Sequence, residues 1–315
     1  MTMKRFILLA MALLGGVVLY AQDVVKTTYH YATHQEQQLY LDRYVVDDET
    51  DEMRPCMIFA FGGGFVQGSR DVDFYKGYFE RLAREGIVVV SIDYRLGLRN
   101  FNAEGGVVAM VGALDNAVTI AVEDIYCATN FVVANAEEWG VDVSKIMLSG
   151  SSAGAITAVQ AEWMRANGDW HAEVLPEGFR YAGVVSCAGA IFSVGKPKFE
   201  SQPAPMLLFH GTSDSNVPYD KASMFGIGFF GSAYIACQLD KMDAPYWFYS
   251  AEYVDHSLAG TPLVDQCDLI MQFIRDFVIA GKPLRIRTEV ESLDGVKRPT
   301  RFKAMDYIRT NYQRD

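Results

Sequence analysis

Apolar residues are spaced along this chain in two ways. Some gather in short runs, and others recur every three to four positions over longer stretches. The first two runs alternate apolar and polar residues and predict an antiparallel hairpin. The later runs are almost continuously apolar, as in strands buried on both faces of a sheet. Together the runs predict eight strands, at residues 24–32, 38–46, 56–61, 87–93, 145–149, 182–187, 205–210 and 246–250.

The stretches with helical spacing lie between these runs. They predict five helices, near residues 72–85, 114–137, 153–166, 231–242 and 265–280. Strands that alternate with helices favour parallel pairing through right-handed crossovers. We therefore predict a mostly parallel, eight-stranded, doubly wound α/β sheet with an N-terminal antiparallel hairpin. It forms one domain over residues 22–281.

The N-terminus has the pattern of an export signal. Lys4 and Arg5 precede an apolar run that ends at Tyr20, which is typical of a signal peptide cleaved after Ala21. We expect residues 1–21 to be removed and the protein to be periplasmic or extracellular. The apolar run is shorter than the ~20 residues of a membrane-spanning helix, so no stable membrane span is expected.

Composition and charge narrow the range of functions. The chain is 50% apolar with a formal net charge of −11, and no basic run alternates with aromatic residues, so a nucleic-acid partner is not expected. Residues 282–315 hold nine basic and five acidic residues and predict a basic polar tail. The five cysteines lack the spacing of metal ligands, and we predict no metal site. Their odd number leaves at least one thiol unpaired, and whether a disulfide forms stays open.

The segment Gly150–Gly154 reads Gly-Ser-Ser-Ala-Gly, between the predicted strand 145–149 and the predicted helix 153–166. A G-x-S-x-G sequence between a strand and a helix is typical of a nucleophile elbow, a sharp turn that exposes the serine hydroxyl. The glycines are needed because a Cβ there would collide with the neighbouring backbone. We predict that Ser152 is a nucleophile.

A serine nucleophile needs a general base and a carboxylate that orients the base. Asp214 lies in the loop after strand 205–210, and His256 lies in the loop after strand 246–250. The order Ser152, Asp214, His256 is that of α/β-hydrolases. The other four histidines lie in the hairpin, in a polar loop and at a strand end, so we assign the base to His256.

An oxyanion hole is expected in the glycine-rich loop after strand 56–61. There the chain reads Phe61-Gly62-Gly63-Gly64. We predict that the backbone N–H groups of Gly63 and Gly64 turn towards the reacting carbonyl, together with the N–H of Ala153. A second glycine pattern, GxGxxG at 226–231, follows a loop and opens no strand–helix–strand unit. We interpret it as a flexible aromatic segment that packs on the core or lines the acyl pocket, not as a dinucleotide site.

Four stretches between Tyr40 and Ile279 resemble α/β-hydrolase carboxylesterases of the hormone-sensitive-lipase and carboxylesterase type. Phe61–Gly64 is similar to the HGGG motif of these enzymes and Ser91–Leu96 to their DYRL segment. Asn135–Ala155 resembles the stretch that ends in the serine elbow, and His210–Asp214 is similar to the HGTxD turn that carries the triad acid. The chain departs from the pattern at Phe61, which replaces the usual histidine, and at Ser151, where many relatives carry an acidic residue.

The resemblance implies the α/β-hydrolase fold and ester hydrolysis through an acyl-serine, without a cofactor or metal. Only residues 188–204 are available for a lid, so we expect an open site for short acyl groups or for esters on a bulky scaffold such as a carbohydrate. A serine peptidase or another acyl hydrolase of the same fold is the alternative, and a non-catalytic binding protein is a third. Activity on aryl esters, activity on aminoacyl amides, or activity on neither distinguishes the three.

Overall fold

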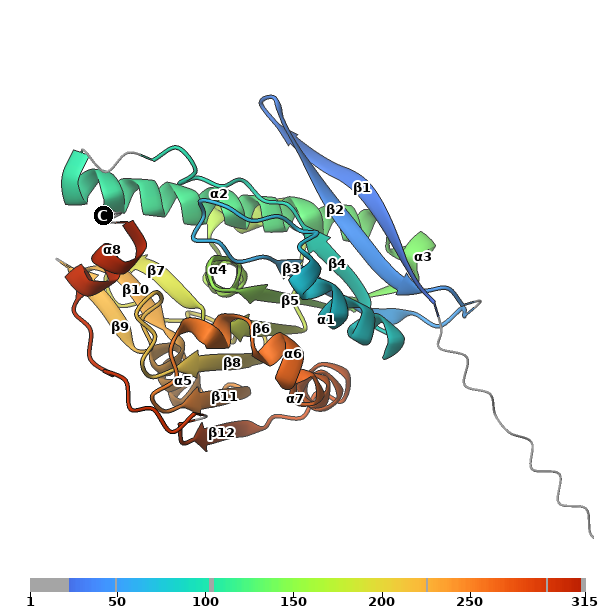
Figure 1. The fold of residues 1–315 in the computed structure, drawn as a ribbon. Helices are drawn as coiled ribbons and strands as arrows, with labels where there is room; N and C mark the ends of the chain where they lie inside the picture. The colour runs from blue at the N-terminus through green and yellow to red at the C-terminus, as the bar shows by residue number, and fades with distance from the viewer. Residues whose placement is uncertain (1–22, 49, 102–104, 225, 293, 313–315) are drawn as a thin grey trace, which may run out of the picture.

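A nine-stranded sheet crosses the protein and carries helices on both faces (Figure 1). The computed structural model describes residues 23–48, 50–101, 105–224, 226–292 and 294–312, and the predicted signal peptide, 1–21, lies outside them. In sheet order the strands are β1 (Val24–His34), β2 (Gln37–Val46), β4 (Val88–Ile92), β3 (Arg54–Ala60), β5 (Val141–Ser151), β6 (Gly183–Cys187), β8 (Met206–Gly211), β11 (Tyr246–Ala251) and β12 (Arg285–Val290).

The strands run in the directions that the sequence pattern predicts. β1 and β2 form an antiparallel hairpin, β2 pairs antiparallel with β4, and every later pairing in this sheet is parallel. All eight predicted strands are present. The order β4-β3-β5 places the elbow after β5 next to the glycine loop after β3, because the carboxyl ends of parallel strands meet at one edge of the sheet.

The ninth strand corrects the prediction of eight. β12 lies within the residues that we assigned to a polar tail after 281, and it pairs parallel with β11 at the sheet edge. Its half-buried Ile286, Thr288 and Val290 alternate with exposed charged residues. An edge strand with one solvated face has this alternation, and its charged positions led us to assign the segment to a tail.

A second, three-stranded antiparallel sheet has the order β7-β10-β9. It consists of β7 (Ala190–Val194), β9 (Lys221–Met224) and β10 (Ile227–Gly231). All of the GxGxxG pattern except its first glycine, Gly226, lies in β10, so this segment is an ordered strand. The small sheet was not predicted, because its short strands include polar residues and glycines and do not form continuous apolar runs.

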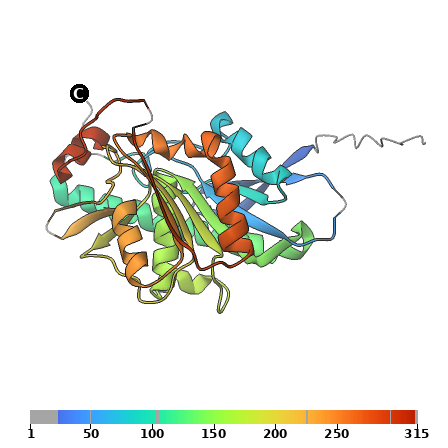
Figure 2. The same cartoon turned by 90° about the horizontal axis from the view of Figure 1, so that it is seen from below.

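The helices differ in length and lie on both faces of the main sheet. The longer ones are α1 (Asp73–Arg84), α2 (Gly106–Ala134), α4 (Ala153–Ala166), α5 (Ser232–Lys241) and α7 (Cys267–Phe273), which continues as a π-helix to Ile279; the shorter ones are α3 (Ala136–Trp139), α6 (Pro262–Asp265) and α8 (Ala304–Tyr312). Figure 2 shows α1 and α7 on one face of the main sheet and α2 and α5 on the other. In Figure 1, α8 lies beside β9 and β10, at the end of the molecule where α2 begins.

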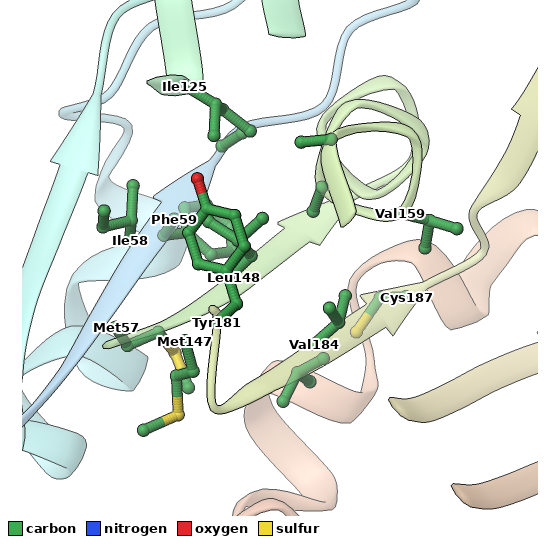
Figure 3. Packing of buried hydrophobic residues seen from close by; sticks show 14 of the residues in the cluster. Met57, Ile58, Phe59, Ile125, Met147, Leu148, Val159, Tyr181, Val184 and Cys187 are labelled. Carbon is green, nitrogen blue, oxygen red and sulfur yellow. The ribbon is translucent and has the colours of Figure 1, made fainter. Parts of the chain in front are cut away.

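The core lies on both faces of the central strands. Phe59 of β3 is fully buried against α1 on one face, and Leu148 of β5 and Val184 of β6 are fully buried near Val159 of α4 and Ile125 of α2 on the other (Figure 3). Burial of a large apolar side chain stabilises a protein by about 1.5–3 kcal/mol. The central strands are therefore a rigid base for the loops at their carboxyl ends.

Among the described residues, one helical segment, Val108–Ala134 of α2, is long and apolar enough to cross a membrane by length and composition. Slightly more than half of its most apolar window, 56%, is buried inside the protein. Burial of this kind is typical of a core helix, and it explains the apolar composition of α2.

Candidate active site

Ser152 occupies a strained turn between β5 and α4. Its backbone has φ +51° and ψ −117°, a combination that non-glycine residues rarely adopt and that costs of order 1–3 kcal/mol. The turn is fixed from both sides, because the Ser152 N–H donates to the Cys187 carbonyl (2.9 Å) and the Ser152 carbonyl accepts from the Ile156 N–H (2.9 Å). The predicted elbow is therefore formed, and Ser152 is the N-cap of the 14-residue helix α4.

The glycines on each side of Ser152 allow three backbone segments to approach one another. A Cβ added to Gly150 would lie 2.3 Å from the Gly154 carbonyl group. A Cβ on Gly154 would lie 2.0 Å from the carbonyl oxygen of Ala60, at the end of β3. Both distances are far shorter than a van der Waals contact, so only glycine permits α4 to begin this close to β3.

The side chains of Ser152, His256 and Asp214 form a hydrogen-bonded chain. Ser152 Oγ lies 2.8 Å from His256 Nε2, and His256 Nδ1 lies 2.7 Å from Asp214 Oδ2. A carboxylate only accepts hydrogen bonds, so Nδ1 carries the proton and Nε2 of the neutral ring accepts from the serine hydroxyl. This is the arrangement in which a histidine removes the proton of a serine nucleophile.

Asp214 is fully buried, and four donors hold its carboxylate. Oδ1 accepts from the backbone N–H groups of Asn216 (2.8 Å) and Val217 (2.9 Å), and Oδ2 lies 2.7 Å from His256 and 3.4 Å from His210. Burial by itself would raise the pKa of Asp214, but the hydrogen bonds from His210 and His256 outweigh it and hold the pKa well below its ordinary value. Asp214 therefore stays anionic.

His210 is a contact of the site that the sequence analysis left in its strand. The ring is completely buried, with Nε2 3.2 Å from the Val217 carbonyl and Nδ1 2.8 Å from Ser232 Oγ. Because a carbonyl only accepts, Nε2 carries the proton and points it towards Val217 and Asp214. The signal for this role was present in the sequence, since His210 and Asp214 stand four residues apart in one strand-end turn.

The loop after β3 is held by two tyrosines. The Tyr94 hydroxyl donates to the Phe61 carbonyl (2.8 Å), and the Tyr75 hydroxyl accepts from the Gly62 N–H (3.2 Å). Gly63 and Gly64 then adopt φ values of +133° and +64°, which favour glycine. In the part of the chain that the structure describes, the N–H groups of Gly63 and Gly64 make no hydrogen bond within the protein.

A cavity opens directly at Ser152, with about 370 Å³ of empty space that includes its mouth. Gly64 and Ala153 line it beside Ser152, whereas Gly63 does not. Of the three predicted oxyanion donors, Gly64 and Ala153 line the cavity, and Gly63 directly precedes Gly64 in the same turn. A Cβ on Gly63 would lie 1.9 Å from the Gln67 carbonyl oxygen, so this glycine is required by the turn itself.

The C-terminal residues also reach the site, although we predicted a tail. Asn311 of α8 lines the cavity, and its amide hydrogen-bonds to the carbonyl of Asn216 (3.0 Å). Ser213 Oγ donates to the Arg298 carbonyl (3.3 Å), next to Asp214. No local sequence signal identified these contacts, because they join residues about 85 to 95 positions apart.

All five cysteines lie among the described residues and are free thiols. Cys56, Cys187 and Cys267 are buried, Cys127 is half-buried and Cys237 is exposed. The structure therefore contains no disulfide between the described residues. The buried thiols pack as small apolar side chains in the core.

The fold and the elbow define an α/β-hydrolase. A thermophilic esterase from Thermogutta terrifontis, solved with propionate, has a similar structure with a TM-score of 0.59 and 22% identity, over 82% of this chain and 94% of that one. The same esterase phosphoramylated by tabun aligns with a TM-score of 0.57 and 22% identity, over 80% and 94% of the two chains. The predicted α/β-hydrolase fold is confirmed.

Sequence comparisons find similarity to esterases over part of the chain. A family model described as BD-FAE matches residues 41–189. Acetylcholinesterase of Gallus gallus is 36% identical over 120 residues, and fumonisin B1 esterase of Sphingopyxis macrogoltabida is 37% identical over 103 residues. These matches cover 38% and 32% of this chain but only 15% and 18% of the two relatives. The chain has the α/β-hydrolase fold, and part of its sequence is similar to carboxylesterases.

Proposed function

We propose that this protein is a serine carboxylic-ester hydrolase that acts through an acyl-serine intermediate. The observation that carries the proposal is the chain of two short hydrogen bonds from Ser152 through His256 to the buried Asp214. The strained turn presents Ser152 at a cavity, and a buried carboxylate orients the histidine. Acyl transfer needs these groups in this arrangement.

In the first half of the reaction, Ser152 Oγ attacks the ester carbonyl carbon while His256 Nε2 takes the hydroxyl proton. The carbonyl oxygen becomes an oxyanion, which the N–H groups of Gly64 and Ala153 stabilise together with the field at the start of α4. The C–O bond to the alcohol then breaks, and His256 gives its proton to the departing oxygen. Asp214 stabilises the imidazolium throughout.

In the second half, a water molecule attacks the acyl-serine and His256 takes one of its protons. The tetrahedral intermediate collapses to the free acid, and the proton returns to Ser152 Oγ. The enzyme ends in its starting state, with one water consumed for each ester cleaved. Removal of one oxyanion donor costs about 10²–10³ in kcat in serine hydrolases.

We propose short acyl esters as substrates, with esterified carbohydrate as the natural class to test after simple aryl esters. The small cavity at Ser152 suits a short acyl group, and the Thermogutta terrifontis esterase was solved with propionate and with butyrate bound. One relative is named fumonisin B1 esterase, and the open site that the sequence leads us to expect has room for an ester on a bulky scaffold such as a carbohydrate. Acetylated oligosaccharides are therefore the natural probes after simple aryl esters.

The test compares initial rates on nitrophenyl acetate, butanoate and octanoate for the wild type and Ser152→Ala. We expect the variant to lose about 10⁶ in kcat, by analogy with knockouts of a serine nucleophile. Ser151→Ala is the matched control, since Ser151 is buried one residue away and outside the hydrogen-bonded chain. Equal rates for the wild type and Ser152→Ala would refute the proposal, and cleavage of aminoacyl amides but not esters would favour a peptidase.

We also propose that the protein is exported and cleaved after Ala21. The charged and apolar pattern of residues 1–21 supports this proposal. N-terminal sequencing of protein recovered from the periplasm or medium of an expressing bacterium is expected to begin at Gln22. Recovery of the full-length chain from the cytoplasm alone would contradict the proposal.

A further inference from the structure

A second, larger cavity lies next to the one at Ser152. It has about 630 Å³ of empty space including its mouth, and its lining is almost entirely apolar. Several elements contribute to it, among them Leu114 of α2, Phe192 of β7, Met224 of β9 and Ile308 of α8. Apolar cavities of this kind bind the apolar parts of ligands, and the mechanism above gives this one no role.

The two cavities lie on the acyl side of the reacting carbonyl. The alcohol oxygen of the ester must lie beside His256, because His256 protonates it as it leaves. Neither cavity is lined by His256, whereas Gly64 and Ala153 line the smaller one. A substrate whose carbonyl oxygen points at these N–H groups therefore places its acyl group in the smaller cavity, with the larger one beyond it.

Four residues line both cavities and stand between them: Asn216, Pro218, Phe229 and Asn311. Phe229 is the largest of the four. It extends from β10, the middle strand of the small sheet, and its ring lies 5.0 Å from that of Phe192, which lines only the larger cavity. The two asparagines are joined by hydrogen bonds at the rim.

We propose that the Phe229 ring limits the length of the acyl group, and that the larger cavity is an extension of the acyl site that opens when the ring is removed. The inference rests on the proposed esterase function and adds a residue that determines its specificity. With the ring in place, an acyl chain ends within the smaller cavity. Without it, the far end of a chain of about eight carbons is buried among the apolar side chains beneath α8.

The test measures kcat/KM on nitrophenyl butanoate and octanoate for the wild type and Phe229→Ala. Burial of one methylene is worth roughly a fourfold gain in binding, and the octanoyl group has four more methylenes than the butanoyl group. Because part of the chain stays near the mouth, we expect the octanoate-to-butanoate ratio to rise by at least about tenfold. A ratio that stays within threefold of wild type in a folded variant overturns the proposal.

Two further variants separate the loss of the ring from general damage. Phe230→Ala makes the same truncation one residue along the strand, at a buried ring that lines neither cavity and packs against Tyr234, and it is expected to leave the ratio unchanged. Ala222 is the cross-strand partner of Phe229 and also lines the larger cavity. Adding Ala222→Phe to Phe229→Ala is therefore expected to restore the short-chain preference.

The other possible outcomes also support or overturn the proposed role of Phe229. If Phe229→Ala does not fold, the smaller truncation Phe229→Leu must raise the ratio by about threefold or more, and an unchanged ratio counts against the proposal. A wild-type enzyme that already prefers octanoate shows that the ring is no limit and overturns it. Wild-type rates equal to those of Ser152→Ala on every ester refute the esterase function itself, and this inference falls with it.

Discussion

Substitution of Gly154 by alanine tests the contact between α4 and β3 directly. The added Cβ would lie 2.0 Å from the Ala60 carbonyl oxygen and 2.5 Å from both the Ala60 carbonyl carbon and the Phe61 carbonyl oxygen. Ordinary contacts of a Cβ begin near 3.4 Å. The start of α4 must therefore move away from β3 by more than 1 Å, because the atoms that it meets are backbone and cannot rotate away.

The free-energy cost follows from the size of this shift. Adding a methyl group to a well-packed interior costs about 1–3 kcal/mol. The upper half of that range applies here, since three backbone atoms are involved, and the better helix propensity of alanine recovers at most about 1 kcal/mol. The shift moves Ser152 together with α4, and a misplacement of about 1 Å in an active site costs on the order of 10² in rate.

The measurements are thermal unfolding and kcat/KM on nitrophenyl acetate. We expect Gly154→Ala to unfold roughly 4 °C or more below wild type and to lose about 10² in kcat/KM. The matched control is Gly112→Ala in the second turn of α2, where the added Cβ meets nothing within 4 Å. That variant is expected to gain about 0.5–1 kcal/mol in stability with unchanged activity. Wild-type stability and activity in Gly154→Ala would show that the close approach of α4 to β3 does not matter.

Three further perturbations test other parts of the site. The pKa of Asp214 is depressed in the folded state, so its ionisation stabilises the fold above the unfolded-state pKa of about 3.9, and this contribution is lost as pH falls below that value. Urea unfolding should therefore show a steeper loss of stability below about pH 4 in wild type than in Asp214→Asn. Parallel stability curves for the two proteins would contradict this. Tyr75→Phe removes the hydroxyl that accepts from the Gly62 N–H, so we expect a loss of about 1 kcal/mol by urea unfolding and a several-fold loss in kcat/KM, whereas unchanged values would show that the loop needs no such support. Truncation after residue 281 removes β12 and α8 and exposes the edge of β11, so we expect lower thermal stability and aggregation by size-exclusion chromatography; a monomer as stable as the full chain would indicate that these elements are dispensable.

The central strands and helices were predictable because their buried positions are apolar, consecutively in the strands and at helical spacing in the helices. The runs CMIFAF, in and just after β3, and IVVVSI, in and just before β4, have no polar face, so neither segment can lie at the surface of the protein. The small sheet carried no such signal. Its strand β9 reads Lys-Ala-Ser-Met, and these residues become a strand only because β10 lies beside them.

The three side chains that we propose as nucleophile, base and acid could be selected from the sequence because each lies in a loop directly after a strand. Chain order then assigned a role to each, and the structure brings the three side chains within hydrogen-bonding distance. For the aromatic segment 226–231 the sequence left two positions open, on the core or at the acyl pocket, and the pairing of β10 with β7 brings Phe229 to the cavity at Ser152. Asn311 was not predictable as a neighbour of Ser152, because it reaches the cavity through the position of α8 and this contact has no pattern in local sequence.

The backbone contact among Gly150, Gly154 and Ala60 has a consequence for how this enzyme class can diversify. The distance between the nucleophile and the oxyanion loop is set by main-chain atoms, so side-chain substitutions elsewhere have little means of changing it. The walls of the acyl pocket, by contrast, are side chains on the small sheet and on α8, which face the elbow from the other side of the cavity. Recognition can therefore be redesigned, in evolution or in the laboratory, at positions that leave the geometry of bond cleavage intact.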